Sequence, residues 1–295
     1  MKLGLIGTGA IGMPMALRIV EGGIPLSFYA RRPEAIERLE KAGATFLEKS
    51  ALGKECDTVL LIVNTFSQCM DCVQSLLKEM QGGVIAVCST IAPAEAKMLE
   101  NLCLESGTAV VSAPVTGGVA NAEIGKLTVI TSGRKERVDA LAPVFRCFAS
   151  KLVYAGKEVE QAAAMKLLIQ RLVGIHCAAA AETLVLGAKC GLDPELIYDT
   201  VCASSGVSRM FELRAKAMIE RDFSARGTID ILHKDLKYAA GMADEKGCSV
   251  PLGKAAFDLF QIAEDTLPDT HEDFSAVIKV YERWSGITVE KQSGE

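Results

Sequence analysis

Residues 2–23 read KLGLIGTGAIGMPMALRIVEGG, and this stretch decides the fold. A short apolar run turns directly into the spacing GxGxxG, and an apolar helical pattern follows that ends at two glycines. A strand, a glycine turn and a helix in this order are the context in which the spacing binds a dinucleotide. A plain glycine-rich turn is the alternative.

Each glycine of the turn has its own physical role. The first permits the tight turn, the second lets a pyrophosphate approach the backbone, and the third lets the helix pack close to the strand. The unpaired N–H groups and the positive dipole end of the helix attract the phosphates. We therefore expect the whole turn to contact the cofactor through Gly7, Thr8, Gly9, Ala10, Ile11 and Gly12.

The second apolar run, PLSFYA, ends at Ala30, which lies 18 residues beyond Gly12. Sites that prefer NAD commonly carry Asp or Glu here, where the carboxylate holds the ribose hydroxyls. In this chain Ala30 is followed by Arg31 and Arg32, whose guanidinium groups can bind a 2′-phosphate in a fork geometry. We expect all three residues to contact the cofactor and the site to prefer NADP(H) over NAD(H). Ordinary solvated charges at a strand end are the alternative.

Apolar runs of strand length recur at residues 58–64, 84–88 and 109–113, separated by helix-length patterns. The first of them is apolar on both faces, which is typical of a buried parallel strand. Right-handed βαβ connections bring the carboxyl ends of such strands to one edge, where ligands bind. The runs at residues 127–133 and 151–156 are expected to extend the sheet. Further cofactor contacts are expected from Val63, Asn64, Thr65 and Thr90.

Residues 161–190 contain no proline and are rich in Ala and Leu, and Gly191 follows directly. This composition predicts one long helix with a C-terminal stop. Lys166 and Gln170 are four residues apart near its start, so they share one helix face. The charged tail after Trp284 is expected to be frayed. Between this long helix and the tail the sequence shows only helical patterns. They begin near residue 193 and recur over residues 209–221, 229–246 and 253–265.

The fold class that these patterns predict is α/β. Residues 1–160 are expected to form a Rossmann-type domain with a doubly wound parallel sheet that binds NADP. Residues 161–295 are expected to form an all-helical domain for substrate binding and oligomerisation, joined by the long helix. We expect the active site in the cleft between the two domains.

Composition excludes several classes of protein. The net charge is -5 and no basic block is present, which argues against a nucleic-acid partner. No charge-free apolar run reaches the roughly 18 residues that a membrane span needs. The first residues enter a strand at once, so we expect no signal peptide and a cytoplasmic location.

The chain has 10 cysteines at irregular spacing, which favours reduced, buried thiols such as Cys88, Cys177 and Cys202. Cys69 and Cys72 have CxxC spacing, but a zinc site needs a second ligand pair that the sequence lacks. We interpret this pair as structural, with redox chemistry or metal binding as the alternatives, and expect no metal.

Two further motifs carry polar groups suited to chemistry. The sequence SAPVTGG at residues 112–118 supplies hydroxyls and accessible backbone N–H groups, which suit a substrate carboxylate; a tight glycine loop is the alternative. In the motif that starts at His233, Lys234 is a candidate second cation near substrate or cofactor and Asp235 orients it; a surface ion pair is the alternative. Expected substrate contacts are Ser112, Thr116, Gly117, Gly118, Gln170 and Lys234, and expected cofactor contacts here are Lys234 and Asp235.

The motifs GxGxxG-MPMA, STIAP, APVTGG, Lys166 at the start of a long helix, and HKDL follow one another in one order. This order resembles the β-hydroxyacid dehydrogenases over nearly the whole chain, from residue 2 to residue 282. That group includes 3-hydroxyisobutyrate dehydrogenase, tartronate semialdehyde reductase, and the succinic semialdehyde and glyoxylate reductases. The resemblance implies that Lys166 is the catalytic lysine. Two departures are Gln170, where the family usually has asparagine, and residues 157–161, where it usually repeats glycine.

The resemblance implies an NADPH-dependent reductase of small carboxylated semialdehydes or glyoxylate, working in reverse on β-hydroxyacids. In reduction an ammonium group stabilises the charge on oxygen and donates the proton, and in oxidation the neutral amine is the base. An NAD-dependent 3-hydroxyisobutyrate-type dehydrogenase and an imine reductase of the same fold are alternatives, although such imine reductases generally lack the lysine. A non-catalytic NADPH-binding sensor is an alternative of another class. We expect a homodimer or homotetramer.

Overall fold

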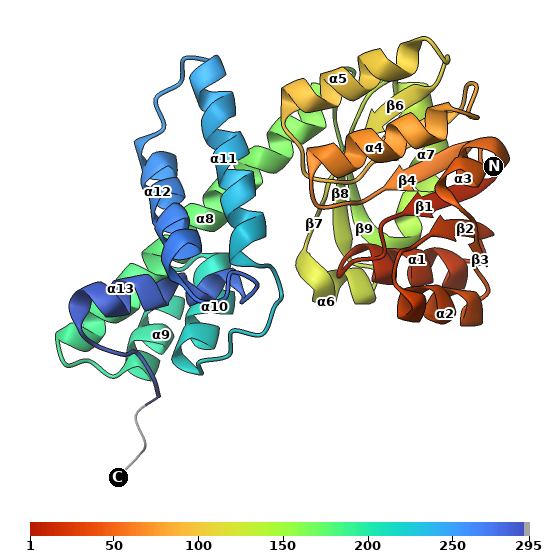
Figure 1. The fold of residues 1–295 in the computed structure, drawn as a ribbon. Helices are drawn as coiled ribbons and strands as arrows, with labels where there is room; N and C mark the ends of the chain where they lie inside the picture. The colour runs from red at the N-terminus through yellow and green to blue at the C-terminus, as the bar shows by residue number, and fades with distance from the viewer. Residues whose placement is uncertain (292–295) are drawn as a thin grey trace. The chain divides into compact units, whose positions relative to one another are not determined.

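The computed structural model describes residues 1–291. The chain forms two compact units, the first ending at Lys166 and the second beginning at Leu167. Helix α8, Glu160–Lys189, starts in the first unit and continues into the second (Figure 1). The functional division into a cofactor domain and a substrate domain after residue 160 stays a prediction.

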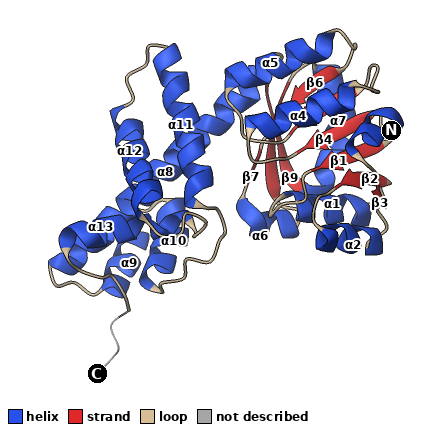
Figure 2. Ribbon diagram, in the orientation of Figure 1, coloured by secondary structure: helices blue, strands red, loops and turns tan. Residues whose placement is uncertain are grey.

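A nine-stranded sheet forms the centre of the first unit, in the order β3-β2-β1-β4-β5-β6-β8-β7, with β9 beside β8 (Figure 2). All neighbouring strands from β3 to β6 are parallel. The strand order changes direction next to β1, as in other doubly wound sheets, and such a point leaves a crevice for ligands at the carboxyl ends. The strands are β1 Leu3–Ile6, β2 Leu26–Tyr29, β3 Thr45–Phe46, β4 Thr58–Leu61, β5 Val84–Val87, β6 Ala109–Ser112, β7 Val115–Thr116, β8 Leu127–Ser132 and β9 Ala149–Gly156.

Helices cover both faces of this sheet (Figure 1). One apolar core joins α1, α2, α6 and α7 to the sheet, and a second core joins α3, α4, α5 and the start of α8 to the other face. Strands β1, β4 and β5 are buried along their whole length because both faces are covered. The predicted Rossmann-type fold is therefore confirmed. The helices are α1 Gly12–Glu21, α2 Pro33–Lys41, α3 Lys49–Glu55, α4 Phe66–Leu77, α5 Pro93–Leu104, α6 Gly118–Glu123 and α7 Lys135–Phe148.

The far end of the sheet departs from the expected parallel arrangement. The chain continues from β6 through Pro114 into β7, turns in the six-residue α6 and returns antiparallel as β8. Ser112 therefore lies opposite Ser132, and Thr116 lies opposite Thr128. A short connection favours an antiparallel return, because a parallel one needs a full crossover along the sheet. The two late runs extend the sheet, as predicted, but in mixed orientation.

The second unit is helical, as predicted. Its core joins apolar side chains of α8 to those of every later helix. The side chains of Asp193 and Ser208 cap the first two of these helices by accepting backbone N–H bonds. Among the described residues after Cys190 the one β-type pairing is an isolated bridge between Thr228 and Asp273. The elements are α9 Pro194–Cys202, α10 Arg209–Ile219, α11 Ile229–Glu245, α12 Pro251–Thr266, the 3₁₀ helix η1 Phe274–Val277 and α13 Ile278–Ser285.

The tail after Trp284 is packed as far as it is described. Val289 is fully buried, its N–H donates to the Glu282 carboxylate at 2.7 Å, and its carbonyl accepts from Arg221 at 3.2 Å. The expectation of a frayed tail is therefore wrong up to Lys291, because Val289 lies in the core of the second unit and Ile287 packs against it. Residues 292–295 of that prediction lie outside the described residues.

The thiols are mostly buried. Burial raises the pKa of Cys88 to about 12, and the pKa of Cys177 also rises through burial. Such thiols are poor nucleophiles because the thiolate is the reactive form. The prediction of buried thiols is confirmed for these two residues and wrong for Cys202, which is partly exposed at the end of α9.

Helix α8 is also the one helix in the described part of the chain that could cross a membrane by length and apolar composition. The core helix of a soluble protein meets the same criteria, so this is a weak indication.

Candidate functional site

The glycine turn between β1 and α1 has the geometry that its spacing predicts. Gly7 has φ +109°, and a Cβ there would lie 1.9 Å from the Ile62 carbonyl oxygen. A Cβ on Gly12 would lie 1.9 Å from the Gly7 carbonyl oxygen. A Cβ on Gly9, in contrast, would meet no heavy atom within 4 Å. Two glycines are thus required by close packing, and Gly9 borders open space that fits a pyrophosphate.

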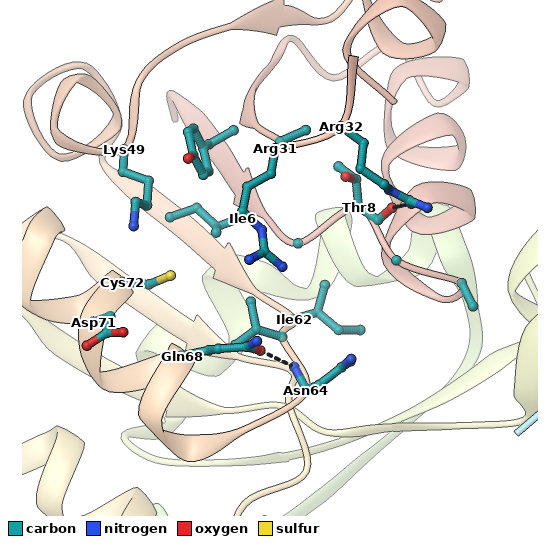
Figure 3. Close-up of a pocket in the computed structure, with 16 residues that line it drawn as sticks. Ile6, Thr8, Arg31, Arg32, Lys49, Ile62, Asn64, Gln68, Asp71 and Cys72 are labelled. Atoms are coloured by element: carbon teal, nitrogen blue, oxygen red, sulfur yellow. Dashed lines mark hydrogen bonds between the residues drawn. The ribbon is translucent and has the colours of Figure 1, made fainter. Parts of the chain in front are cut away.

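A pocket of about 420 Å³ opens at the carboxyl ends of β1, β2 and β4, within the size range of small-molecule sites (Figure 3). It is bounded by the glycine turn and by residues of α3 and α4. The predicted cofactor residues that line it are Gly7, Thr8, Gly9, Ala10, Ala30, Arg31, Arg32, Val63 and Asn64. The lining does not include Ile11, Gly12, Thr65, Thr90, Lys234 and Asp235.

The two arginines after β2 differ in orientation. The Arg32 guanidinium donates to the carbonyl oxygen of Thr8 at 2.8 Å, so it braces the glycine turn. The Arg31 guanidinium points toward the middle of the pocket (Figure 3). The arginines therefore do not form the single two-guanidinium fork that adjacency in the sequence suggested.

The sequence reasoning missed seven lining residues. Three are the strand-end residues Ile6, Tyr29 and Ile62, and the other four are Lys49 on α3 and Gln68, Asp71 and Cys72 on α4. Asp71 brings a carboxylate into a pocket whose β2 end carries none. No local pattern marks Lys49, Asp71 or Cys72, because their role depends on how α3 and α4 pack. Gln68 could have been found, since a Thr followed three residues later by Gln is a helix-capping pattern.

That capping pattern explains the position of Thr65. Its hydroxyl accepts the N–H of Gln68 at 3.2 Å, and the Gln68 side chain accepts the N–H of Asn64 at 3.0 Å. Thr65 thus starts α4 instead of lining the pocket. Ser89, which precedes Thr90, accepts the N–H of Val63 at 2.7 Å and ties the end of β4 to the end of β5.

Charged groups of the pocket act on the Cys72 thiol. Burial raises the pKa of Cys72, and the positive charge of Lys49 acts against this more strongly than that of Arg31. The negative charge of Asp71 adds to the rise. The CxxC pair lies on α4 with both cysteines buried, which suits a structural role.

The SAPVTGG motif spans the turn from β6 to α6. Ser112 is buried at the end of β6, and Thr116 ends β7. Gly117 has φ +134° and Gly118 has φ +77°, conformations that favour glycine. The Asn121 side chain donates to the Gly117 carbonyl at 2.6 Å and closes the turn. The motif therefore forms a defined turn with N–H groups at the start of α6.

The start of α8 is anchored to the sheet by Ser132 of β8, which the sequence reasoning missed. The Ser132 hydroxyl accepts the N–H of Ala162 at 3.0 Å and donates to the carbonyl of Val159 at 2.9 Å. Val159 is fully buried in the sheet core. Lys166, one turn further along α8, is only 7% exposed. The segment that replaces the family's glycines is thus fixed on the body that carries the glycine turn.

In the second unit, Asp235 on α11 joins two of the predicted substrate residues. Its carboxylate accepts the Gln170 amide at 2.6 Å and the Lys234 ammonium at 2.7 Å, and it is 1% exposed. The Lys234 ammonium also lies 5.0 Å from the Tyr238 ring centre. Asp235 therefore fixes the positions of both side chains, and Lys234 is not merely one half of a surface ion pair.

Replacing Asp235 with Asn is expected to lower the free energy of unfolding by about 1–3 kcal/mol, because buried bonds to a charged partner are lost. Urea denaturation measures the change. The control is Asp258→Asn, which removes an exposed pair with Lys254 at 3.4 Å and should cost under about 1 kcal/mol. Equal losses in the two variants would contradict the anchoring role of Asp235.

Within residues 1–291 no group of three or more His, Cys, Asp or Glu side chains is arranged to hold a metal ion.

Two family models cover most of the chain. Residues 2–156 match the NAD binding domain of 6-phosphogluconate dehydrogenase, and residues 161–281 match the NAD-binding region of NADP-dependent 3-hydroxyisobutyrate dehydrogenase. An L-threonate dehydrogenase of Cupriavidus necator is 34% identical over 95% of this chain and 96% of its own length. The glyoxylate/succinic semialdehyde reductase 2 of Arabidopsis thaliana is 28% identical over 94% of this chain and 78% of its own length.

A similar solved structure is the 3-hydroxyisobutyrate dehydrogenase of Salmonella typhimurium, with a TM-score of 0.87, 29% identity, and coverage of 95% of this chain and 99% of that one. The fold and the glycine turn define an NAD(P)-binding oxidoreductase. The chain belongs to the β-hydroxyacid dehydrogenase family. Its activity is that of a hydroxyacid dehydrogenase on small carboxylated substrates.

Proposed function

We propose that the protein is a cytoplasmic, NADPH-dependent oxidoreductase that acts on small carboxylated substrates with Lys166 as the general acid and base. One observation carries the proposal: a lysine only 7% exposed follows the point where Ser132 pins α8 to the sheet that bears the dinucleotide turn. Packing that restricts the lysine favours directed proton transfer over a solvated surface role.

When bound, the nicotinamide supplies or accepts the hydride. In the reducing direction the Lys166 ammonium donates its proton to the carbonyl oxygen as negative charge develops there. In the oxidising direction the neutral amine takes the proton of the alcohol. Thr116 and the N–H groups of Gly117 and Gly118 are proposed to hold the substrate carboxylate. Asp235 is proposed to fix the orientation of the Gln170 amide, which donates to its carboxylate at 2.6 Å.

The proposed preference for NADP(H) rests on the charge of the pocket. Three cationic side chains line it, from Arg31, Arg32 and Lys49, against the one carboxylate of Asp71. The family model that matches residues 161–281 is named after an NADP-dependent enzyme. A 2′-phosphate carries up to two negative charges at neutral pH, so this excess of positive charge favours it over a hydroxyl.

Replacing Arg31 with Ala is expected to weaken NADPH binding about 10- to 100-fold, because a bond between charged groups is worth about 1.5–3 kcal/mol. NADH binding should change less than about twofold, since its ribose carries no phosphate. Titration of cofactor fluorescence measures both constants. Arg32→Ala, which releases the Thr8 carbonyl, should weaken both cofactors to a similar extent. An equal loss of NADPH and NADH in Arg31→Ala would refute the role of Arg31.

For the substrate we propose a short hydroxylated carboxylate, with L-threonate as the first candidate because the relative that is 34% identical carries that name. Glyoxylate and succinic semialdehyde are the second candidates because the Arabidopsis relative is named for their reduction. The extra methylene of Gln170, relative to the family's asparagine, lets its amide reach Asp235 at 2.6 Å. The side chain is thereby proposed to shape the substrate site differently from that of its relatives.

The experiment that tests the function is a rate screen with purified protein. Oxidation of L-threonate and of short β-hydroxyacids is followed with NADP⁺ and NAD⁺, and reduction of glyoxylate and short semialdehydes with NADPH and NADH. Turnover of any of these substrates with NADP⁺ or NADPH, at a higher rate than with NAD⁺ or NADH, supports the proposal. Tight NADPH binding without turnover on any of them would favour a non-catalytic cofactor sensor.

We also propose a homodimer or homotetramer. Several large apolar side chains of the second unit are more than half exposed in the single chain, among them Leu186 at 64% and Leu252 at 68%. Association would remove such surface from water.

A further inference from the structure

A lysine of the first unit that no sequence motif marks is brought to the cofactor pocket by strand pairing. β2 and β3 run parallel, with Ser27 opposite Thr45 and Phe28 opposite Phe46. The N–H of Leu47 then donates to the Phe28 carbonyl at 2.9 Å, and α3 begins at Lys49. Because both strands point the same way, the residues after each of them lie at the same edge of the sheet. Lys49 therefore reaches the pocket that Arg31 enters after β2.

The Lys49 ammonium lies over an aromatic ring and is in no ion pair that the described residues form. It lies 5.5 Å from the ring centre of Tyr29, the last residue of β2, and that ring in turn packs against Phe46 at 6.2 Å. Within residues 1–291 neither Lys49 nor Arg31 forms an ion pair with a carboxylate. Both side chains line the same pocket (Figure 3).

The charged side chains that line the pocket make different interactions. Arg32 is engaged with the carbonyl of Thr8. Arg31, after β2, and Lys49, on α3, remain as two cations, and the positive charge of each acts on the Cys72 thiol of α4. Asp71 is the one carboxylate in the lining. A phosphate monoester with up to two negative charges matches the two cations, whereas a ribose hydroxyl leaves both without a partner.

We propose that Lys49 is a specificity-determining residue that binds the 2′-phosphate of NADP(H) together with Arg31, while Asp71 limits the affinity. The inference rests on the proposed NADP(H) preference and deepens it. The selectivity of the site is thus set by a lysine after β3 as well as by an arginine after β2. Removing Lys49 is expected to lower selectivity without changing the nicotinamide chemistry, because Lys49 lies beside Tyr29 at the end of β2, where dinucleotide sites of this fold bind the ribose.

The test uses the full-length protein and measures dissociation constants for NADPH and NADH by cofactor fluorescence. Lys49→Met keeps the length of the stem and removes the charge, and Lys49→Arg keeps the charge. The matched control is Lys54→Met, which removes an exposed lysine from the same helix outside the pocket. Unlabelled 2′-AMP and 5′-AMP serve as competitors, because only the first carries the 2′-phosphate.

Lys49→Met is expected to weaken NADPH and 2′-AMP binding about tenfold. NADH and 5′-AMP binding should stay within about twofold, Lys49→Arg should retain most of the selectivity, and Lys54→Met should match the wild type. Asp71→Asn should tighten NADPH binding about twofold to fivefold, since a repelling charge is removed.

Two adverse results are distinguishable. If the wild-type protein binds NADH more tightly than NADPH, the proposed cofactor preference fails and this inference fails with it. If the wild type prefers NADPH and Lys49→Met keeps the full preference, the preference stands and the role of Lys49 is overturned. An equal loss of NADPH and NADH in Lys49→Met would also overturn it.

Discussion

Replacing Lys166 with Ala is expected to lower kcat by about 10²- to 10⁴-fold, the range that a positioned general acid or base contributes. The physical reason is that a carbonyl oxygen gains negative charge during reduction and needs a proton donor nearby. NADPH affinity should stay within about twofold, because Lys166 is not among the residues that line the dinucleotide pocket. Initial rates with saturating cofactor and substrate measure the change.

Two variants make this result specific to the amine of Lys166. Lys189→Ala removes an exposed lysine at the other end of α8 and should leave kcat unchanged. Lys166→Met preserves the volume of the side chain and should lose as much activity as Lys166→Ala. Small primary amines added to Lys166→Ala should restore part of the rate if the missing group is a proton carrier. Full activity in both Lys166 variants would remove this residue from the mechanism.

The second large effect is expected from alanine substitutions in the glycine turn. Substitution at Gly9 should weaken cofactor binding, whereas substitution at Gly12 should destabilise the protein itself. Gly9→Ala is expected to leave the stability of the apoprotein unchanged within about 1 kcal/mol, since its methyl group meets no protein atom within 4 Å. NADP(H) binding should weaken about 10- to 100-fold, because a methyl group intrudes where the pyrophosphate approaches, and overpacking costs about 1–3 kcal/mol.

Gly12→Ala is expected to destabilise the apoprotein itself by about 3 kcal/mol. Its methyl carbon would lie 1.9 Å from the Gly7 carbonyl oxygen and 2.8 Å from the Ile62 side chain, so the backbone must move. Urea denaturation without cofactor separates the two variants, and fluorescence titration gives the binding constants. If Gly9→Ala loses as much stability as Gly12→Ala, the open space at Gly9 is not a cofactor site.

Much of the fold could be predicted because its signals are local. An apolar run followed by GxGxxG and a helical pattern requires no knowledge of distant residues, and the turn has the expected close packing at Gly7 and Gly12. The long helix was predicted within one residue of its observed ends, since thirty residues without proline leave few other structures. Both late strands were also found, but not the antiparallel return of β8, because strand direction depends on the connection and not on the strand's own residues.

The candidate site was less accessible to sequence reasoning. Arg31 and Arg32 are adjacent and chemically identical, and both line the pocket, yet only the Arg32 guanidinium donates to the Thr8 carbonyl, while the Arg31 guanidinium points toward the middle of the pocket. The tail was misjudged at Val289. Its side chain lies in the core of the second unit, and its backbone is hydrogen-bonded to Arg221 and Glu282. In each case the environment that decides the role is supplied by residues distant in sequence.

The sequence by itself determined the Rossmann-type fold, the helical second unit and the family, because periodicity, glycine spacing and motif order are properties of neighbouring residues. Only the tertiary structure decided which polar groups meet. Parallel pairing of β2 and β3 brings Lys49 to the pocket that Arg31 also lines. The Ser132 hydroxyl anchors the start of the helix that bears Lys166, and the Asp235 carboxylate binds both Gln170 and Lys234. These contacts depend on how strands and helices pack in three dimensions, and no residue spacing along the chain predicts them.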